Sequence, residues 1–218
     1  MKKITFLLLF VCGFTAWSWA QAFNFAQASS PEQQVISLHL GYAHSFQARL
    51  GYAREFVAGK PLLLGGEIAL PAGNSLNDWQ GNLGGQADCL QWGDFHLVGK
   101  AYAVLRKWKM DYVSAWSWGT DLALVGGFYR KQGFLATEIG YDRSWFTNLQ
   151  HGKAHLENYP NAVSGWYQSK AGSLYFGLQG GYSWSHIDLN LRVARTFRPN
   201  GRANLIPFQA LIGLNYRW

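Results

Sequence analysis

The chain has 218 residues, of which 49% are hydrophobic and 17% aromatic, whereas only 14% are charged. Soluble domains usually carry about 25% charged residues, and a mean hydropathy of −0.11 excludes a bundle of membrane helices. The low charge and high apolar content also exclude an intrinsically disordered chain. A composition of this kind is typical of an alternating β protein with one face toward lipid.

The N-terminus predicts a cleaved secretory signal peptide, residues 1–20. Lys2 and Lys3 form a positive start, residues 4–17 are almost entirely apolar, and residues 18–20 place Ser and Ala where cleavage requires small side chains. Residues 20–22 offer a second cleavage site. The apolar run of about 14 residues is shorter than the ~20 that a spanning helix needs. Cleavage at residue 20 lowers the formal net charge from +7 to +5.

Alternation of apolar with polar or small residues recurs along the mature chain, as expected for strands with two different faces. The clearest case is the C-terminus, where Leu214, Tyr216 and Trp218 end a run of apolar residues that starts at Ala210. Clear helical periodicity is missing. The same alternation is found at 112–128, 133–146, 168–184 and 187–198.

The C-terminal segment resembles the last strand of bacterial outer-membrane β-barrel proteins, which typically ends in an aromatic residue with apolar residues at alternate positions before it. The resemblance implies that Leu214, Tyr216 and Trp218 form the assembly signal that the barrel-assembly machinery reads. It also implies a location in the outer membrane of a Gram-negative bacterium, in contact with lipid and lipopolysaccharide. Small OmpX-like and OmpW-like barrels behave in this general way, although no motif ties the chain to either.

We predict an all-β fold: a closed antiparallel transmembrane β-barrel of ten strands, with eight strands as the alternative. An even number is typical of bacterial single-chain barrels. The barrel is expected to occupy residues 34–218, after the signal peptide at 1–20 and an N-terminal periplasmic lead-in at 21–33. The ten predicted strands are 34–44, 46–57, 62–70, 80–91, 95–106, 112–128, 133–146, 168–184, 187–198 and 205–218.

An even strand number places both termini on the periplasmic side, where connections are short, and leaves longer loops outside. Counting from the C-terminus assigns the short turns at 58–61, 92–94 and 130–133 to the periplasmic side. It assigns the longer loops at 71–79, 147–167 and 198–204 to the outer side.

Charged residues at inward positions are expected to pair inside the lumen, because an unpaired buried charge is costly. The first interpretation is a salt-bridged plug; the alternative is a narrow channel for small or apolar solutes. Eight strands leave an interior just wide enough for side chains, whereas porins use about 16–18. Inward glycines such as Gly140 leave room either for a solute or for long side chains. The predicted interior charge network comprises Arg49, Glu67, Asp88, Asp121, Glu138, Arg192 and Arg217.

Basic residues gather at the predicted outer end of the barrel. Lipopolysaccharide carries phosphates on the outer leaflet, and Arg and Lys donors pair well with phosphate. We therefore hypothesise a rim that contacts lipopolysaccharide; the alternative is a collar that serves solubility and orientation. The predicted rim comprises Arg106, Lys107, Lys109, Arg195, Arg198 and Arg202.

Other chemistries have weaker support. His151 and His155 would share one helical face as a metal pair, but no helical apolar pattern and no third ligand accompany them, so we expect no metal and no cofactor. Omptin-type proteases and lipid A acyl-transferases or deacylases make a surface enzyme the second alternative, although no nucleophile–base motif stands out. The pI of about 9.5 would suit nucleic-acid binding, which a secreted, lipid-facing chain does not favour. The sequence leaves the oligomeric state open.

Overall fold

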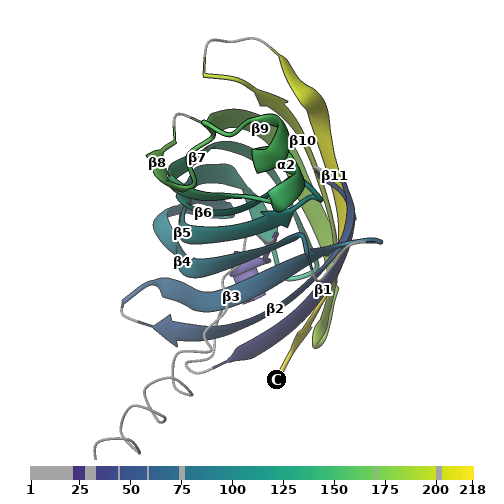
Figure 1. Ribbon diagram of the computed structural model, residues 1–218. Helices are drawn as coiled ribbons and strands as arrows, with labels where there is room; N and C mark the ends of the chain where they lie inside the picture. Colours follow the sequence, from purple (N-terminus) through teal and green to yellow (C-terminus); the bar gives the residue numbers. More distant parts are fainter. Residues whose placement is uncertain are drawn as a thin grey trace, which may run out of the picture.

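The strands of the computed structural model close into a barrel (Figure 1). The described residues are 22–27, 33–43, 45–57, 59–73, 77–169, 171–199 and 203–218. The predicted signal peptide at 1–20 and the predicted rim residue Arg202 lie outside these ranges.

Ten antiparallel strands form the barrel, and an extra strand, β8 (Gly165–Gln168), pairs with the far end of β7. The helical elements in the described ranges are the 3-10 turn η1 (Phe25–Gln27) and the short helix α2 (Lys153–Asn158), and neither is long and apolar enough to cross a membrane. The barrel strands are β1 (Gln34–Tyr42), β2 (Phe46–Val57), β3 (Pro61–Pro71), β4 (Trp79–Trp92), β5 (Phe95–Lys109), β6 (Val113–Arg130), β7 (Gly133–His151), β9 (Gly172–Trp184), β10 (Ile187–Phe197) and β11 (Ala203–Arg217).

Two pairings close the sheet on itself. Strand β1 pairs with β11, with Val35 opposite Arg217, and β6 pairs with β7. The prediction of a closed antiparallel ten-stranded barrel is therefore confirmed, and the eight-stranded alternative is wrong. The largest difference lies at 147–167, where a loop was expected. There β7 continues to His151 because its end pairs with both β6 and β8, and α2 follows.

The two ends of the barrel differ in their connections. We call the end that holds Gln34 and Trp218 the terminal end; the two residues exchange backbone hydrogen bonds of 3.1 Å there. At this end, each connection between consecutive strands has two or three residues, and these connections include the three predicted short turns. The opposite end, the loop end, carries the three predicted longer loops. Counting strands from the C-terminus therefore separates the short turns from the long loops correctly.

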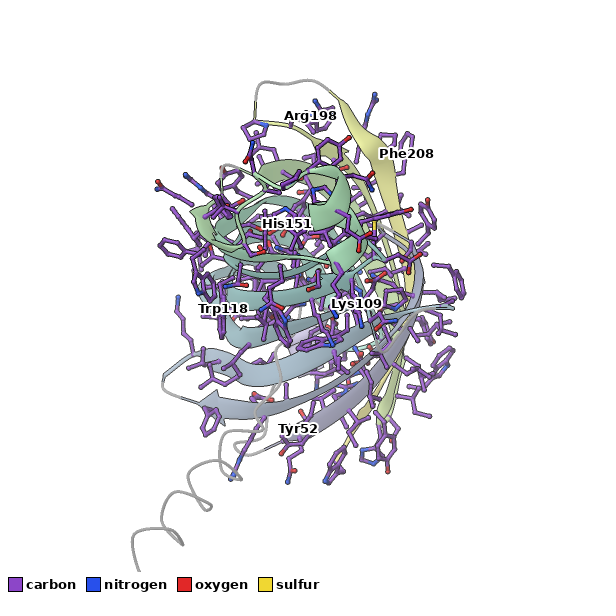
Figure 2. All side chains as sticks on the ribbon, viewed as in Figure 1. Tyr52, Lys109, Trp118, His151, Arg198 and Phe208 are labelled. Carbon is purple, nitrogen blue, oxygen red and sulfur yellow. The ribbon has the colours of Figure 1, made fainter. Side chains whose placement is uncertain are left out.

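Side chains alternate between the lumen and the outer surface. In β10, the exposed positions hold Leu189, Leu191 and Val193, whereas Asn190 and Arg192 are buried. This distribution reverses the one found in soluble proteins, where apolar residues fill the core. Figure 2 shows Tyr52 and Phe208 at the outer surface, near opposite ends of the barrel.

Candidate functional site in the barrel lumen

A central layer of charged side chains crosses the middle of the lumen. Glu138 on β7 accepts hydrogen bonds from Lys100 Nζ on β5, at 3.2 Å, and from Arg192 Nε on β10, at 2.5 Å. No two of these strands are neighbours, so both contacts run across the barrel interior. Lys100 also donates to Gln179 and Arg192 to Gln209, at 3.4 and 3.0 Å. The layer therefore ties opposite walls of the barrel together.

A second ion pair belongs to the same layer. Arg49 Nη1 on β2 lies 3.0 Å from Glu67 Oε1 on β3, and Asn82 donates to that same oxygen at 3.3 Å. Both charged side chains are buried. Close by, His39 Nε2 lies 3.1 Å from Asn190 Oδ1. The central layer thus spans the lumen from β2 to β10.

A more accessible layer lies toward the loop end. Arg106 Nη2 donates to Asp142 Oδ2 at 2.7 Å, and the Tyr175 hydroxyl donates to Asp121 Oδ1 at 2.7 Å. The side chains of Arg106 and Asp142 are 22% and 23% exposed, whereas those of Lys100 and Glu138 are 2% and 1% exposed. The layer toward the loop end is therefore more accessible to solvent than the central layer.

The position of Arg106 corrects its assignment to the rim. Strand β6 separates β5 from β7, so the contact between Arg106 and Asp142 must cross the inner face of the sheet. Arg106 also donates to Gln80 and Ser144, at 3.1 and 3.3 Å. Its guanidinium group therefore belongs to the lumen rather than to the outer surface.

These two layers balance in charge when all groups are ionised. Burying charges in hydrogen-bonded pairs avoids the large penalty of an isolated buried ion. The four cations are Arg49, Lys100, Arg106 and Arg192, and the four carboxylates are Glu67, Asp121, Glu138 and Asp142.

Two inward glycines make room for large side chains in the lumen. A Cβ atom at Gly140 would lie 2.2 Å from the Tyr175 ring, which is opposite in the β7–β9 register. A Cβ at Gly213 would lie 1.8 Å from the ring of His39. An inward glycine leaves room either for a solute or for a long side chain. At Gly140 and Gly213, the room is taken by side chains that lie across the lumen.

The two remaining members of the predicted charge network lie at the terminal end. Arg217 Nη2 donates to Asp188 Oδ1 at 2.7 Å, and His96 Nδ1 lies 2.6 Å from Asp88 Oδ2. The predicted residues thus line one lumen but form separate groups along it. Sequence reasoning missed Asp188 as a partner, although the alternation of β10 places it on the inward face.

Residues 22–27, which we call the N-terminal segment, lie inside the terminal end of the barrel (Figure 1). The Asn24 side chain is fully buried and donates to the Arg130 carbonyl at 2.8 Å and to Ser183 Oγ at 2.9 Å. Asn215 Nδ2 donates to the Ala22 carbonyl at 3.1 Å. This part of the expected lead-in therefore enters the lumen.

Aromatic rings anchor the N-terminal segment. Phe23 and Phe25 pack edge to face with ring centroids 5.5 Å apart, and Phe25 contacts Tyr129 in the same way at 6.0 Å. Tyr129 stacks on Phe134 at 5.3 Å. Such edge-to-face and stacked pairs add to the stabilisation from apolar burial. The signal in the sequence was two phenylalanines within the predicted periplasmic lead-in.

Outward cations at the loop end lie over aromatic rings. Arg143 Cζ is 4.3 Å from the ring centroid of Trp145, and Arg195 Cζ is 5.3 Å from that of Phe197. Cation–π contacts of this kind are attractive. Lys107 Nζ similarly lies 5.5 Å from the Trp116 ring, and Arg195 lies 5.7 Å from the Phe208 ring. Of the other predicted rim residues, Lys109 and Arg198 are exposed.

The two loop histidines are neighbours in space. The rings of His151, at the end of β7, and His155, in α2, stack with centroids 4.8 Å apart, and His155 packs on Tyr159 at 5.0 Å. The expected loop contains a short helix, because α2 covers 153–158. Among the described residues, no group of three potential ligands could hold a metal ion.

The predicted assembly signal lies on the outer face of β11. Leu214, Tyr216 and Trp218 are each nearly half exposed, and the rings of Tyr216 and Trp218 stack at 5.8 Å. Comparison with known proteins finds no family model that matches the chain and no curated protein with significant similarity. Functional inference therefore rests on the geometry of this chain.

Proposed function

We propose that the chain is an integral β-barrel of the bacterial outer membrane, with a structural or surface-interaction role and a closed lumen. The observation that carries the proposal is the inverted surface: Leu122 and Leu124 are 50% and 51% exposed, whereas Glu138 and Arg217 are each 1% exposed. Exposed apolar side chains on every barrel strand form an apolar belt around the barrel, and such a belt is unfavourable in water. In hydrocarbon, an apolar outer face with a polar interior is the stable arrangement of a barrel.

Aromatic residues at both ends of the apolar belt support the same proposal. Trp and Tyr concentrate where the membrane meets water, because their rings are apolar and their edges polar. Exposed Trp and Tyr rings near the terminal end belong to Tyr182, Trp184, Tyr216 and Trp218, and those near the loop end belong to Tyr42, Trp118 and Trp145.

The contents of the lumen favour a structural or interaction role over a channel. The central layer joins β5, β7 and β10 by direct hydrogen bonds, and the N-terminal segment occupies the terminal end. A conducting path would require both obstacles to move. The loop end, with its long connections and α2, then supplies the surface for interaction.

The short turns support an orientation with the terminal end in the periplasm. The loop end then meets the outer leaflet, where phosphate groups would pair with outward cations. The proposed lipopolysaccharide-contacting rim comprises Lys107, Lys109, Arg143, Arg195 and Arg198.

Fractionation tests the membrane location. The protein is expected in the detergent-extracted outer-membrane fraction, and the folded barrel should migrate differently on gels before and after boiling. Recovery in a soluble periplasmic fraction without detergent would contradict the proposal.

Planar-bilayer recording tests the closed lumen. The refolded protein is expected to produce no discrete conductance steps. Regular steps would instead support the channel alternative.

Charge reversal tests the lipopolysaccharide contact. The triple variant Lys107→Glu, Arg195→Glu, Arg198→Glu is expected to lose most of the lipopolysaccharide that co-purifies with the wild-type barrel. Arg130→Glu, at the exposed terminal end, is the matched control and should retain it. Equal retention by both proteins would refute the rim.

A further inference from the structure

An apolar groove, which we call the outer groove, crosses the outer face of β1, β2 and β3. Its volume is about 280 Å³, and it is lined by Ile36, Leu50, Gly51, Tyr52 and Ile68. Tyr52 lies opposite Ile36 on β1. On the other side of β2, Leu50 lies opposite Ile68 on β3. The outer groove is therefore built by three neighbouring strands and lies outside the lumen.

The register of β2 and β3 explains why the surface is hollow here. Leu64 and Ile68 supply outward side chains on β3, whereas Gly66, between them and directly opposite Tyr52, supplies none. Side chains directly opposite each other on one face of an antiparallel pair start about 5 Å apart. A missing side chain therefore leaves a gap next to the Tyr52 ring.

Polar groups lie between the outer groove and the terminal end. The Tyr52 hydroxyl, on the outer surface (Figure 2), donates to Gln34 Oε1 at 2.7 Å. Gln34 lies opposite Arg54 in the β1–β2 register. Arg54 follows Tyr52 by two residues and therefore shares its outward face, and its Cζ lies 5.6 Å from the ring centroid of Phe56. We call Gln34, Tyr52 and Arg54 the polar end of the groove.

The outer groove and its polar end fit the thickness of one membrane leaflet. Leu50 and Arg54 are four residues apart on β2, which corresponds to about 14 Å along a strand. The hydrocarbon core of a bilayer is about 30 Å thick, so one leaflet contributes about 15 Å. The Tyr52 ring centroid lies 6.5 Å from that of Trp218, and such rings concentrate where the membrane meets water. Arg54 then lies at the level of the head groups and Leu50 deeper in the hydrocarbon.

We propose that the outer groove binds one phospholipid of the periplasmic leaflet, with an acyl chain in the groove and the phosphate at Arg54. The apolar lining suits a hydrocarbon chain. A guanidinium group donates two charge-assisted hydrogen bonds to a phosphate, so the charge of the polar end complements that of the ligand. The proposal rests on the proposed function, because the proposed orientation places the terminal end in the phospholipid leaflet and the loop end in the lipopolysaccharide leaflet.

Native mass spectrometry of the refolded barrel in detergent tests the phosphate contact. The probe is palmitoyl-oleoyl phosphatidylethanolamine, and saturation at one lipid per barrel is expected. Arg54→Gln should weaken binding of this lipid about tenfold, as for loss of one charge-assisted hydrogen bond. Arg130→Gln is the matched control, because Arg130 is an exposed arginine at the same end but outside the groove. Equal binding by all three proteins would overturn the proposal, as would binding of several lipids without saturation.

A second pair of variants tests the outer groove itself. Leu50→Trp places an indole in the groove and should weaken binding about tenfold, as for the loss of about two buried methylene groups. Leu124→Trp makes the same change at an outward leucine of β6 and should bind as the wild type does; the two leucines are 55% and 51% exposed. Equal binding by both variants would mean that the acyl chain does not occupy the groove.

Two further lipids separate the possible ligands. Diacylglycerol with the same acyl chains lacks the phosphate and should bind about tenfold more weakly than the phospholipid; equal binding would overturn the phosphate contact. Excess lipopolysaccharide should leave the phospholipid bound. Displacement of the phospholipid would instead assign the outer groove to lipopolysaccharide and overturn the proposal.

Photo-crosslinking of the wild-type barrel needs no variant to fold. The probe is a phosphatidylethanolamine with a diazirine in one acyl chain, mixed into the vesicles that hold the barrel. Crosslinks are expected to be several times more frequent on peptides from β1, β2 and β3 than on peptides from β6 and β7. An even distribution around the barrel would show a lipid annulus without a specific site.

Failure of this proposal is distinguishable from failure of the proposed function. The detergent measurement does not depend on where the protein is located in the cell. A barrel from the soluble fraction that still binds one phospholipid through Arg54 would support the site and refute the membrane location. A barrel from the outer-membrane fraction that binds phospholipid equally well with and without Arg54 would refute the site alone.

Discussion

In the proposed closed lumen, two regions form the closures, and the two closures are built differently. The central layer consists of side chains from the barrel wall, such as Lys100, Glu138 and Arg192, whose charges balance. At the terminal end the wall contributes apolar and aromatic groups beside the Arg217–Asp188 and His96–Asp88 pairs, and a segment that precedes β1 fills the remaining space. A ten-stranded wall can therefore fill its own lumen where long charged side chains meet across it, and another part of the chain fills the lumen where the ion pairs join only neighbouring strands.

The two closures should also respond differently to substitution. In the central layer, removing Glu138 leaves two buried cations, Lys100 and Arg192, uncompensated, so the loss is abrupt. In the N-terminal segment, each ring contributes its own buried area, so losses accumulate gradually. Variants in the two regions therefore test whether charge holds the first closure and apolar burial the second.

The largest effect is expected from Glu138→Gln. The variant keeps the shape of the side chain but leaves Lys100 and Arg192 without their carboxylate, and breaking a buried ion pair costs about 3–5 kcal/mol. Tryptophan fluorescence during urea unfolding in lipid vesicles measures the change in the free energy of unfolding. The control, Glu157→Gln on α2, should change it little. A loss below about 1 kcal/mol for Glu138→Gln would show that the central layer is not held by charge.

Phe25→Ala should have the next largest effect. It removes a buried ring that contacts Phe23 and Tyr129, and such truncations cost about 3 kcal/mol. The same unfolding measurement applies. Phe208→Ala removes a ring of the same size from the outer surface and should cost less. Equal losses for the two variants would mean that the N-terminal segment does not dock in the lumen.

The outer surface provides a reference for both closures. Leu124→Arg places a charge at mid-height on the outer face and should lower the stability by about 2 kcal/mol in a bilayer. Thr120→Arg, closer to the loop end on the same strand and face, should cost less than about 1 kcal/mol. Stability is again measured by unfolding from vesicles. Equal losses of stability for the two variants would show that the apolar belt does not face lipid.

The smallest effect is expected from Arg130→Ala. The ion pair between Arg130 and Asp94 spans 2.8 Å but is largely exposed, and exposed pairs contribute about 0–1 kcal/mol. A double-mutant cycle with Asp94→Ala should show little coupling. Strong coupling would mean that the terminal end is shielded from water, in contrast to its observed exposure.

Strand number and strand limits were largely predictable, because period-two alternation is a local property of the sequence. The exception is the end of β7, where residues such as Asn148 and Gln150 show no apolar alternation. There the strand persists because it pairs with β6 and β8 beyond the main barrel. The inward direction of Arg106 was likewise hidden, since a basic residue near a strand end fits either face.

The amino-acid sequence was enough to predict an all-β barrel, to favour ten strands, to identify the apolar face, and to name most of the charged residues that point inward, because a strand turns alternate side chains to opposite sides. Which inward groups meet depends on the closed barrel and could not be read from the sequence. Lys100, Glu138 and Arg192 lie on strands that are not neighbours, so their contacts depend on closure of the sheet. Entry of the N-terminal segment into the lumen was decided in the same way, since its binding site exists only once the barrel wall surrounds it.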